Sequence, residues 1–319
     1  ARSSMQEYLQ GHYIAAMAKI GERLSRFPQV VGFDSLNEPS AGFIGKLNLN
    51  KRGGANSFGT TPTPWEAILA GSGRPMPAEI LDIKFFSRGE SGFELASRGK
   101  VGIETVGKEG IRAWKDGVDC LWSRAGVWSE DGGVPVLRKP EHFAFSGGAP
   151  VDFTRDCLEP FIKRFGREVC VAAAVGSTRF VLFVEGVPNA EHPTASVAEG
   201  IPIVDATHWY DDLTLITKRF RGFMAIDARS ESIVLGPRRV GRYFIEAIRE
   251  LRDWSIRKMG GVPMMLGEFG LPFDLSGGKA YRSGDYRVHE RALSAYYDAV
   301  DASLVDSTIW NYTADNRHE

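Results

Sequence analysis

Short apolar segments alternate with longer helical segments along most of the chain, and this alternation restricts the fold more than any other feature. The predicted strands span residues 30–36, 179–185, 203–208, 264–268 and 307–310. The predicted helices span residues 8–27, 152–165, 238–258 and 285–303. Strands that alternate with helices form a mostly parallel sheet, so the sequence predicts an α/β fold. Residues 179–185 form an almost continuous apolar run, which predicts a strand buried on both faces.

Residues 40–150 interrupt this alternation. The stretch is rich in Gly, Pro, Ser and Trp, and it is longer than any ordinary connection between elements. We expect it to consist of extended loops and short elements, inserted into a single domain that spans residues 1–319. Its tryptophans Trp114, Trp122 and Trp128 either form the core of the insertion or provide an apolar wall for a ligand.

Composition excludes several classes of protein. Hydrophobic residues make up 43% of the 319 residues and charged residues 25%, which is ordinary for a globular protein. The formal net charge of −1 provides no basic surface for a phosphate backbone, so no nucleic-acid partner is expected. Three cysteines exclude a disulfide scaffold and fit a reducing compartment such as the cytoplasm. The apolar runs are too short to predict a transmembrane or signal segment.

The most informative polar side chains lie at the C-terminal ends of predicted strands. They are Glu38, Glu185, His208, Glu268 and Trp310. The active sites of (β/α)8 barrels are built at this edge, and doubly wound open sheets also bind ligands there. No Gly-x-Gly-x-x-Gly sequence follows a strand, which argues against a dinucleotide-binding sheet. About five strands are predicted, whereas a closed barrel needs eight.

Two glutamates stand in local sequences that force a turn after a strand. Glu38 precedes Pro39, which cannot continue a strand ladder, and Glu268 lies two residues before Gly270, which permits tight geometry. Alone, either glutamate could be a surface residue beyond a strand. On two strands of one barrel they can face each other across a sugar, as glycoside hydrolysis requires. One then protonates the leaving oxygen while the other attacks the anomeric carbon.

This pattern resembles glycoside hydrolase family 5, within the clan of retaining barrel glycosidases. The resemblance implies that Glu38, at the end of the fourth barrel strand, is the general acid/base. It implies that Glu268, at the end of the seventh, is the nucleophile. The implied sugar-binding residues are Asn37, His208, Tyr210 and Trp310. In the family pattern the Asn binds the sugar 2-hydroxyl, the His lines the site, the Tyr contacts the nucleophile and the Trp forms the floor under the sugar.

A closer resemblance joins the chain to the branch of this family that cleaves glucosylated lipids, the fungal-type β-glucosidases acting on steryl glucosides and glucosylceramide. It rests on residues 32–45, 62–65, 112–122, 126–128, 208–215 and 310–316. The implied reaction is double displacement at the β-glucosidic bond of a steryl β-glucoside or glucosylceramide, with no metal and no organic cofactor. Endoglycoceramidases are more distant kin, and an endo-acting enzyme of that type remains an alternative. The implied partners are the glycolipid and, transiently, a membrane surface, with no obligate protein partner.

Parts of the family pattern have no counterpart in the sequence. They are the first three barrel strands, which bring an Arg and a His to the site, and the small β-sandwich that follows the barrel. We therefore expect an incomplete (β/α)8 barrel with strands four to eight and a large insertion after strand four. The alternative function is that of a truncated or catalytically incomplete homologue that binds glycolipid without turnover.

Three further residues each have two interpretations. Glu185 either lines the substrate cleft or lies in solvent before a turn at Gly186. Asp315 and Asn316 either reach a hydroxyl of the sugar or cap a loop.

Overall fold

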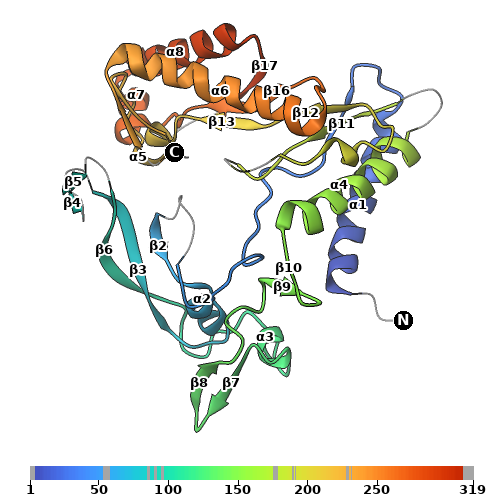
Figure 1. The fold of residues 1–319 in the computed structure, drawn as a ribbon, viewed down its shortest axis with the longest axis vertical. Helices are drawn as coiled ribbons and strands as arrows, with labels where there is room; N and C mark the ends of the chain where they lie inside the picture. The colour runs from blue at the N-terminus through green and yellow to red at the C-terminus, as the bar shows by residue number, and fades with distance from the viewer. Residues whose placement is uncertain are drawn as a thin grey trace. The chain divides into compact units, whose positions relative to one another are not determined.

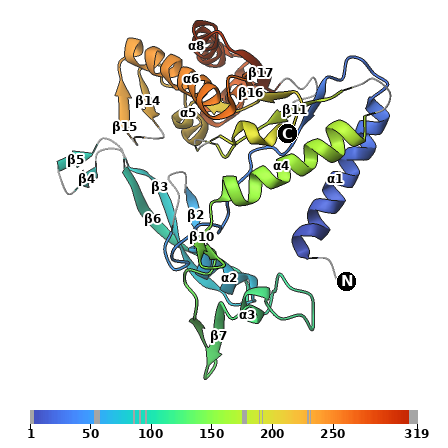
Figure 2. The same cartoon turned by 45° about the vertical axis from the view of Figure 1, so that its right-hand side comes forward.

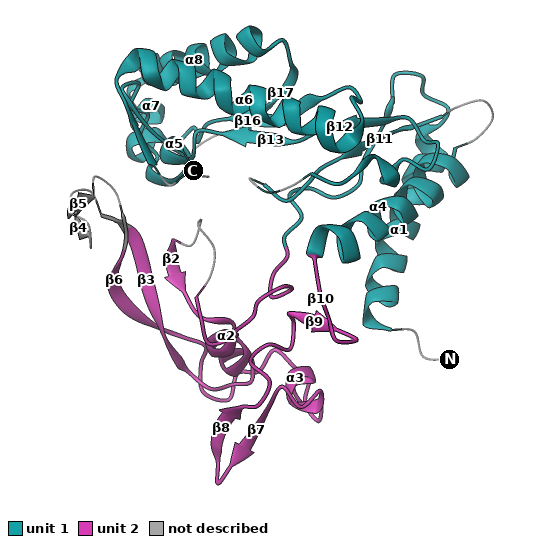
Figure 3. Ribbon diagram, viewed as in Figure 1, with its two compact units in different colours: residues 1–40, 153–319 teal, residues 41–152 magenta. Residues whose placement is uncertain are grey.

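The chain forms two compact units, each with an apolar core of its own. The computed structural model describes residues 4–52, 58–84, 87–89, 92–94, 97–174, 179–188, 190, 192–227, 230 and 232–311. Unit 1 comprises Ala1–Ser40 and Phe153–Glu319, and unit 2 comprises Ala41–Asp152 (Figure 3). Unit 2 therefore interrupts unit 1 in the sequence, directly after the Asn-Glu-Pro motif.

Parallel strands form the frame of unit 1, and their order in space follows their order in the chain (Figure 1). One sheet contains β1 (Gly32–Asp34), β11 (Val181–Val184) and β12 (Ile203–Asp205). The other contains β13 (His208–Tyr210), β16 (Met265–Gly270) and β17 (Asp306–Trp310). The amide of Ala206 donates to the Val184 carbonyl at 2.9 Å and that of Gly267 to the Thr207 carbonyl at 3.0 Å, so the segment from β12 to β13 joins the two sheets. The predicted α/β class is confirmed.

Helices pack against one face of these strands. The helix α1 (Met5–Leu24) lies beside the helical segment 154–172, whose centre is α4 (Glu159–Phe165) (Figure 1, Figure 2). The long helices α6 (Pro237–Met259) and α8 (Arg287–Ser303) pack on each other and on β13 and β16. Shorter elements are α5 (Asp212–Thr217), α7 (Leu275–Ser283), the 3-10 turn Ala195–Val197, and the hairpin of β14 (Met224–Asp227) and β15 (Ser232–Leu235). Among the described helices, none combines the length and hydropathy needed to cross a bilayer.

The ends of the long helices follow from local sequence. The Ser4 hydroxyl accepts a hydrogen bond from the amide of Glu7 at 3.1 Å, which caps the first turn of α1. Pro237 occupies the first turn of α6, where its missing amide hydrogen costs nothing. Gly260 ends that helix with a φ of 71°, a left-handed conformation that a glycine adopts without strain.

The apolar strand β11 is fully buried on one face only. Leu182 and Val184 are completely buried among helix residues, whereas Val181 and Phe183 are half-buried. The prediction that both faces of this strand are buried is therefore wrong. An apolar run shows that a strand tolerates burial, but it does not show which of its faces other elements cover.

The same alternation along β13 and β16 sorts core residues from polar ones. Trp209 and Phe269 point into the core beneath α6 and α8. Successive side chains in a strand point to opposite faces, so His208, Tyr210 and Glu268 lie on the other side. The polar face of the sheet in unit 1 is consequently the one that faces away from the helices.

Unit 2 is built around an antiparallel sheet of β2 (Gly59–Thr61), β3 (Met76–Lys84) and β6 (Ser97–Val106). Its other elements are α2 (Pro64–Gly71), α3 (Leu121–Arg124), and the two-stranded pairs β4 (Ser87–Gly89) with β5 (Gly92–Glu94), β7 (Trp128–Asp131) with β8 (Val134–Leu137), and β9 (Phe145–Ser146) with β10 (Ala149–Pro150). The expectation of extended loops and short elements is wrong for β3 and β6, which pair along their whole lengths. β6 contains glycines and charged residues, so its sequence lacks the apolar run that would predict a strand.

The tryptophans of unit 2 belong to its core. Trp128 is buried, and Trp114 and Trp122 pack partly buried against the same cluster. Trp65 meets Trp128 edge to face, with ring centroids 5.9 Å apart. These contacts favour the core interpretation of these side chains over an apolar wall for a ligand.

Candidate active site

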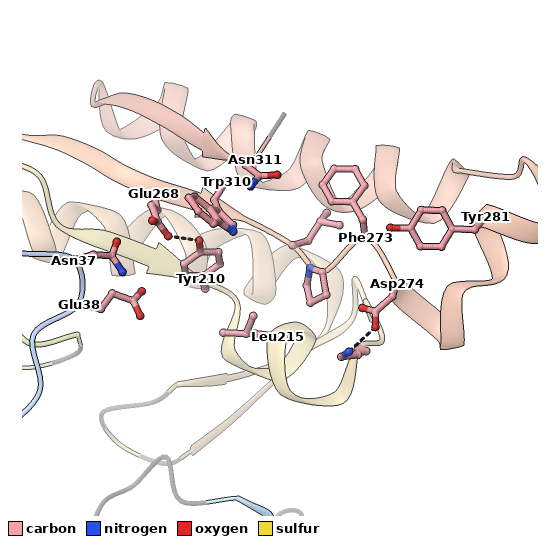
Figure 4. Close-up of a pocket in the computed structure, with 13 residues that line it drawn as sticks. Asn37, Glu38, Tyr210, Leu215, Glu268, Phe273, Asp274, Tyr281, Trp310 and Asn311 are labelled. Carbon is pink, nitrogen blue, oxygen red and sulfur yellow. Dashed lines mark hydrogen bonds and ion pairs between the residues drawn. The ribbon is translucent and has the colours of Figure 1, made fainter. Parts of the chain in front are cut away.

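The ends of the parallel strands in unit 1 bring five of the predicted site residues to one pocket of about 720 Å³ (Figure 4). They are Asn37, Glu38, Tyr210, Glu268 and Trp310. The register of the sheet explains this convergence, because Tyr210, Gly270 and Trp310 are direct neighbours across β13, β16 and β17. Figure 4 shows the Trp310 ring beside Glu268 and Tyr210, and the side chain of Trp310 is substantially exposed.

The two predicted catalytic carboxylates approach each other closely. One oxygen of Glu38, one oxygen of Glu268 and one ring nitrogen of His208 all lie within 4.8 Å of one another. Glu38 is the more exposed of the two, with 43% of its side chain accessible against 16% for Glu268. The site therefore pairs a solvent-facing carboxyl group with a more enclosed one.

Tyr210 contacts Glu268, as the resemblance implies. Its hydroxyl donates to Glu268 Oε2 at 2.7 Å. Burial raises the pKa of Tyr210, and so do this hydrogen bond and the nearby carboxylates of Glu38 and Glu185. Tyr210 consequently stays a neutral donor throughout the physiological range.

His208 lies among three carboxylates and has little exposure of its own. Its side chain is 4% accessible. Nδ1 is 3.0 Å from Glu38 Oε1 and 3.4 Å from Glu268 Oε2, while Nε2 is 3.0 Å from Glu185 Oε1. Burial alone would lower the pKa of His208, but the hydrogen bonds and charges of these partners outweigh it and raise the pKa to about 9. The ring is therefore an imidazolium at neutral pH that bridges the carboxylates, and it is not among the residues that line the pocket.

Glu185 occupies neither of its two expected environments. It is 3% exposed, so it does not lie in solvent, and it is not among the pocket-lining residues. Its Oε2 accepts the backbone amide of Glu38 at 2.8 Å, while Oε1 faces His208. Glu185 directly follows β11, and these contacts place its side chain beneath the site instead of in the cleft.

Asp34 is a residue of the site region that the sequence analysis missed. It ends β1 and accepts the amide of Leu36 at 3.1 Å, and the side chain of Glu185 is close enough to influence its pKa. Burial is the main cause that raises the pKa of Asp34 to about 8, and the charge and hydrogen bond of Glu185 add to it. A charged residue inside the mostly apolar segment 30–36 is the signal that could have identified it.

The pocket extends from the carboxylates along loops that follow β13 and β16. Its apolar side includes Leu215, Leu271, Pro272, Phe273 and Tyr281. An ion pair between Lys218 and Asp274 borders the same region (Figure 4). The sequence analysis missed these residues because they follow the strands in loops and carry no motif of their own. Asp315 and Asn316 lie outside the described residues.

Within the described part of the chain, Glu38, His208 and Glu268 form the one cluster whose spacing would suit a metal ion. The same atoms, however, already contact one another in the manner of hydrogen bonds and ion pairs. A protonated imidazole has no lone pair to offer a cation. We therefore interpret the cluster as an acid–base network.

The chain is similar over almost its whole length to fungal glycosidases, although no family model matches it. It is 28% identical to a glucosylceramidase of Cryptococcus neoformans var. grubii, over 99% of this chain and 43% of the relative. It is 27% identical to a glucosylceramidase of Rhizopus delemar, over 99% of this chain and 46% of the relative. It is 26% identical to an ergosteryl-beta-glucosidase of Saccharomyces cerevisiae, over 99% of this chain and 45% of the relative. The chain thus spans less than half the length of these curated relatives, and the predicted similarity to the steryl glucoside and glucosylceramide branch is confirmed.

A solved structure shows the same fold. The crystal structure of Cryptococcus neoformans sterylglucosidase 1 with tris matches with a TM-score of 0.81 and 23% sequence identity. The match covers 98% of this chain and 46% of that one. A second structure of the same protein, with a bound hit compound, matches with a TM-score of 0.83.

Proposed function

We propose that this chain carries the catalytic centre of a retaining β-glucosidase whose substrate is a glycolipid, a steryl β-glucoside or glucosylceramide. The observation that carries the proposal is the close approach of Glu38 and Glu268, with carboxyl oxygens within 4.8 Å, at the ends of two parallel strands. Carboxyl groups in retaining glycosidases lie about 5–5.5 Å apart, against about 6.5–9.5 Å in inverting enzymes. The names of the similar fungal proteins support the lipid glucoside as substrate class.

The fold proposed for this centre is part of a (β/α)8 barrel. The parallel strands follow one another in space as they do in the chain. If β12 and β13 count as one barrel strand, the order β1, β11, β12 and β13, β16, β17 fits strands four to eight of a barrel. Unit 2 would then be a large insertion after strand four of one catalytic domain. The likeness in fold to sterylglucosidase 1 supports this assignment.

The positions of the two carboxylates support a double-displacement reaction. Glu268 attacks the anomeric carbon while Glu38 delivers a proton to the leaving oxygen. Water then hydrolyses the glycosyl-enzyme, with Glu38 acting as the base. Tyr210 donates to Glu268 Oε2, which leaves Oε1 as the attacking oxygen.

The remaining pocket residues would bind the two parts of the substrate. Asn37 is placed to bind the sugar 2-hydroxyl, and the exposed face of Trp310 is a surface on which the sugar ring can stack. The apolar side of the pocket around Leu215 and Phe273 suits a lipid aglycone. Transient contact with a membrane surface would give access to such a substrate.

The proposal is tested with a fluorogenic aryl β-glucoside, the purified chain and its E268Q variant. We expect turnover by the parent chain and loss of turnover in the variant, with both shown to be folded by circular dichroism. Because the apolar aglycone is part of the proposal, steryl β-glucoside and glucosylceramide in detergent are assayed in parallel. A folded parent that binds glucoside without turnover contradicts the proposal and favours the binding-only alternative.

A further inference from the structure

A chain of neighbouring polar side chains lies behind the proposed catalytic carboxylates and contains two acidic residues that the reaction scheme does not use. Asp34 ends β1, and Glu185 directly follows β11, the neighbouring strand. The register of the two strands and the effect of Glu185 on the pKa of Asp34 place the two carboxyl groups close to each other. Glu185 Oε1 in turn lies 3.0 Å from His208 Nε2, so the chain runs from Asp34 through Glu185 to the imidazole.

Two neighbouring carboxyl groups can form a hydrogen bond only if one of them holds a proton. Ionised carboxylates only accept hydrogen bonds, so one member of the pair must be protonated to donate. Two carboxyl groups in contact and away from water also avoid carrying two negative charges. The pair therefore holds one proton between Asp34 and Glu185.

The surrounding donors place this proton on Asp34. Glu185 is the more buried of the two, and its oxygens face the amide of Glu38 at 2.8 Å and the ring of His208 at 3.0 Å. Two such donors stabilise the ionised form. Asp34 receives one backbone donor, the amide of Leu36. Its pKa, raised to about 8 chiefly by burial and then by Glu185, agrees with a protonated Asp34.

Glu185 also holds Glu38 in an unusual backbone conformation. Glu38 has a φ of 41°, in the left-handed region that non-glycine residues seldom adopt. Such a conformation persists where surrounding contacts enforce it, and Glu185 Oε2 accepts the amide of this very residue. His208, held by the other oxygen of Glu185, reaches Glu38 Oε1 at 3.0 Å. Glu185 therefore fixes both the backbone and the carboxyl group of Glu38.

We propose that Asp34 and Glu185 form a proton-sharing pair, with the proton on Asp34 and the charge on Glu185, and that this charge keeps His208 protonated and positions Glu38. Both are positioning residues, since neither is among the residues that line the pocket. The location of the proton rests on the donors that surround each carboxyl group and on the raised pKa of Asp34. Its consequence for turnover rests on the proposed function.

The other titratable groups around the pair come from the neighbouring elements. Tyr13 of α1 lies near Asp34 and donates its hydroxyl to the Ser35 carbonyl at 3.0 Å, and burial is the main cause that raises its pKa, so this tyrosine stays neutral. Glu38, Glu268 and Tyr210 surround the far side of His208. Loss of the Glu185 charge would therefore leave His208 with two carboxylate partners, so a partial fall in its pKa is expected.

The direct test is a pH titration of His208 by 15N NMR on the intact chain, with the resonance assigned through the H208N variant. In the parent chain we expect a midpoint near 9. The E185Q variant should lower this midpoint by about one pH unit or more, because it removes one carboxylate partner. The D34N variant should leave it unchanged or higher, because an asparagine donates to Glu185 as a protonated aspartic acid does.

Two results would overturn the proposal. An unchanged midpoint in E185Q shows that the charge is not on Glu185, and a midpoint lowered equally by D34N places the charge on Asp34. The matched control is E159Q, which alters another buried glutamate that accepts a backbone amide, that of Thr194 at 2.7 Å. If E185Q fails to fold, the 13C titration of the Asp34 carboxyl in the parent chain decides, with a midpoint near 8 in favour and one below about 5 against.

The effect on turnover is measured separately through the pH profile of kcat/KM. D34N should keep the parental kcat/KM at neutral pH. At alkaline pH its kcat/KM should fall less than that of the parent chain, because the asparagine of this variant cannot ionise as Asp34 does. D34A should have a lower kcat/KM at every pH. An equal loss of kcat/KM in D34N and D34A would show that Asp34 has only a structural role and would contradict the proposal. If the folded parent shows no turnover at all, the proposed function fails, while the NMR titration still decides the location of the proton.

Discussion

The two carboxylates of the site differ in the donors that surround them. Glu268 accepts the Tyr210 hydroxyl at 2.7 Å and lies 3.4 Å from His208, and most of its side chain is enclosed. Glu38 is nearly half exposed and contacts His208 through one oxygen. An enclosed carboxylate with a tyrosine donor and a nearby imidazolium suits the nucleophile, whereas a partly solvated group can exchange its proton with the medium in each cycle.

The hydrogen bond from Tyr210 can be tested by the Y210F variant. A hydrogen bond to a charged group contributes about 1.5–3 kcal/mol, which corresponds to roughly a 10–100-fold fall in kcat/KM if the bond is kept in the transition state. The Y243F variant is the control, because the Tyr243 hydroxyl donates to the Ile226 carbonyl away from the pocket. Equal activity of Y210F and the parent chain would show that this bond does not act on the nucleophile.

The sequence alone identifies the polar residues at the strand ends but not how the residues behind the pocket contact one another. Glu38 and Glu268 are predicted because strand ends and short motifs place such side chains at one edge of a sheet, and Tyr210 is implied by the family resemblance. The contact of Asp34 with Glu185 depends on the register of β1 against β11, which pairs Asp34 with Phe183, two residues before Glu185. Register cannot be read from strand composition, so this pair emerged only from the structure.

At the level of elements, the parallel strands approach one another most closely at glycines. A Cβ placed on Gly32 would meet the backbone carbonyl of Val181 in the adjacent strand. A Cβ on Gly267 would likewise meet the carbonyl of Ala206, and a Cβ on Gly270 would meet the carbonyl of Trp310. These glycines let the strands that carry Glu38 and Glu268 pack at ladder distance.

The G32A variant should therefore lower the free energy of unfolding by about 1–3 kcal/mol, because the added methyl group overpacks β1 against β11. Gly241 lies inside α6 with open space around it, so G241A should raise the same quantity by about 0.5–1 kcal/mol. Urea denaturation followed by circular dichroism measures both. A G32A variant as stable as G241A would contradict the close approach of these two strands.

Helices and strands with strong patterns could be predicted, and weakly patterned ones could not. The predicted helices 238–258 and 285–303 correspond to α6 and α8, whose apolar faces build the core over β13 and β16. The hairpin of β14 and β15 was missed, and so was the pair of β3 and β6. Strands in these pairs are short, or interrupted by glycine and charge, so long-range pairing stabilises them more than local preference does.

For the whole molecule, protons held by the site should make stability depend on pH. Burial and Glu185 raise the pKa of Asp34 from 3.8 to about 8, and His208 is raised from 6.5 to about 9 despite its burial. The folded chain therefore binds more protons than the unfolded chain above about pH 4, so the free energy of unfolding falls as the pH rises through these ranges. Thermal unfolding between about pH 6 and pH 9 should show a falling midpoint, with a shallower slope in D34N. A midpoint that rises over this range would contradict both assignments.

The pocket and all the residues proposed for catalysis belong to unit 1, whereas unit 2 has a separate core with its own tryptophans. The relatives share this whole stretch, since their similarity covers 99% of the chain. The central claim concerns Glu268 within unit 1, and it can be tested without reference to how the two units are arranged.

The most direct test is covalent trapping of the nucleophile with an activated 2-deoxy-2-fluoro-β-glucoside, which slows hydrolysis of the glycosyl-enzyme. Peptide mass spectrometry should then find one fluorodeoxyglucosyl group on Glu268 of the parent chain and none on the E268Q variant. Prior incubation with an unlabelled glucoside should slow the labelling. Label on any other residue, or a folded chain that takes up no label, would contradict the assignment of Glu268 as the nucleophile of a retaining glycosidase.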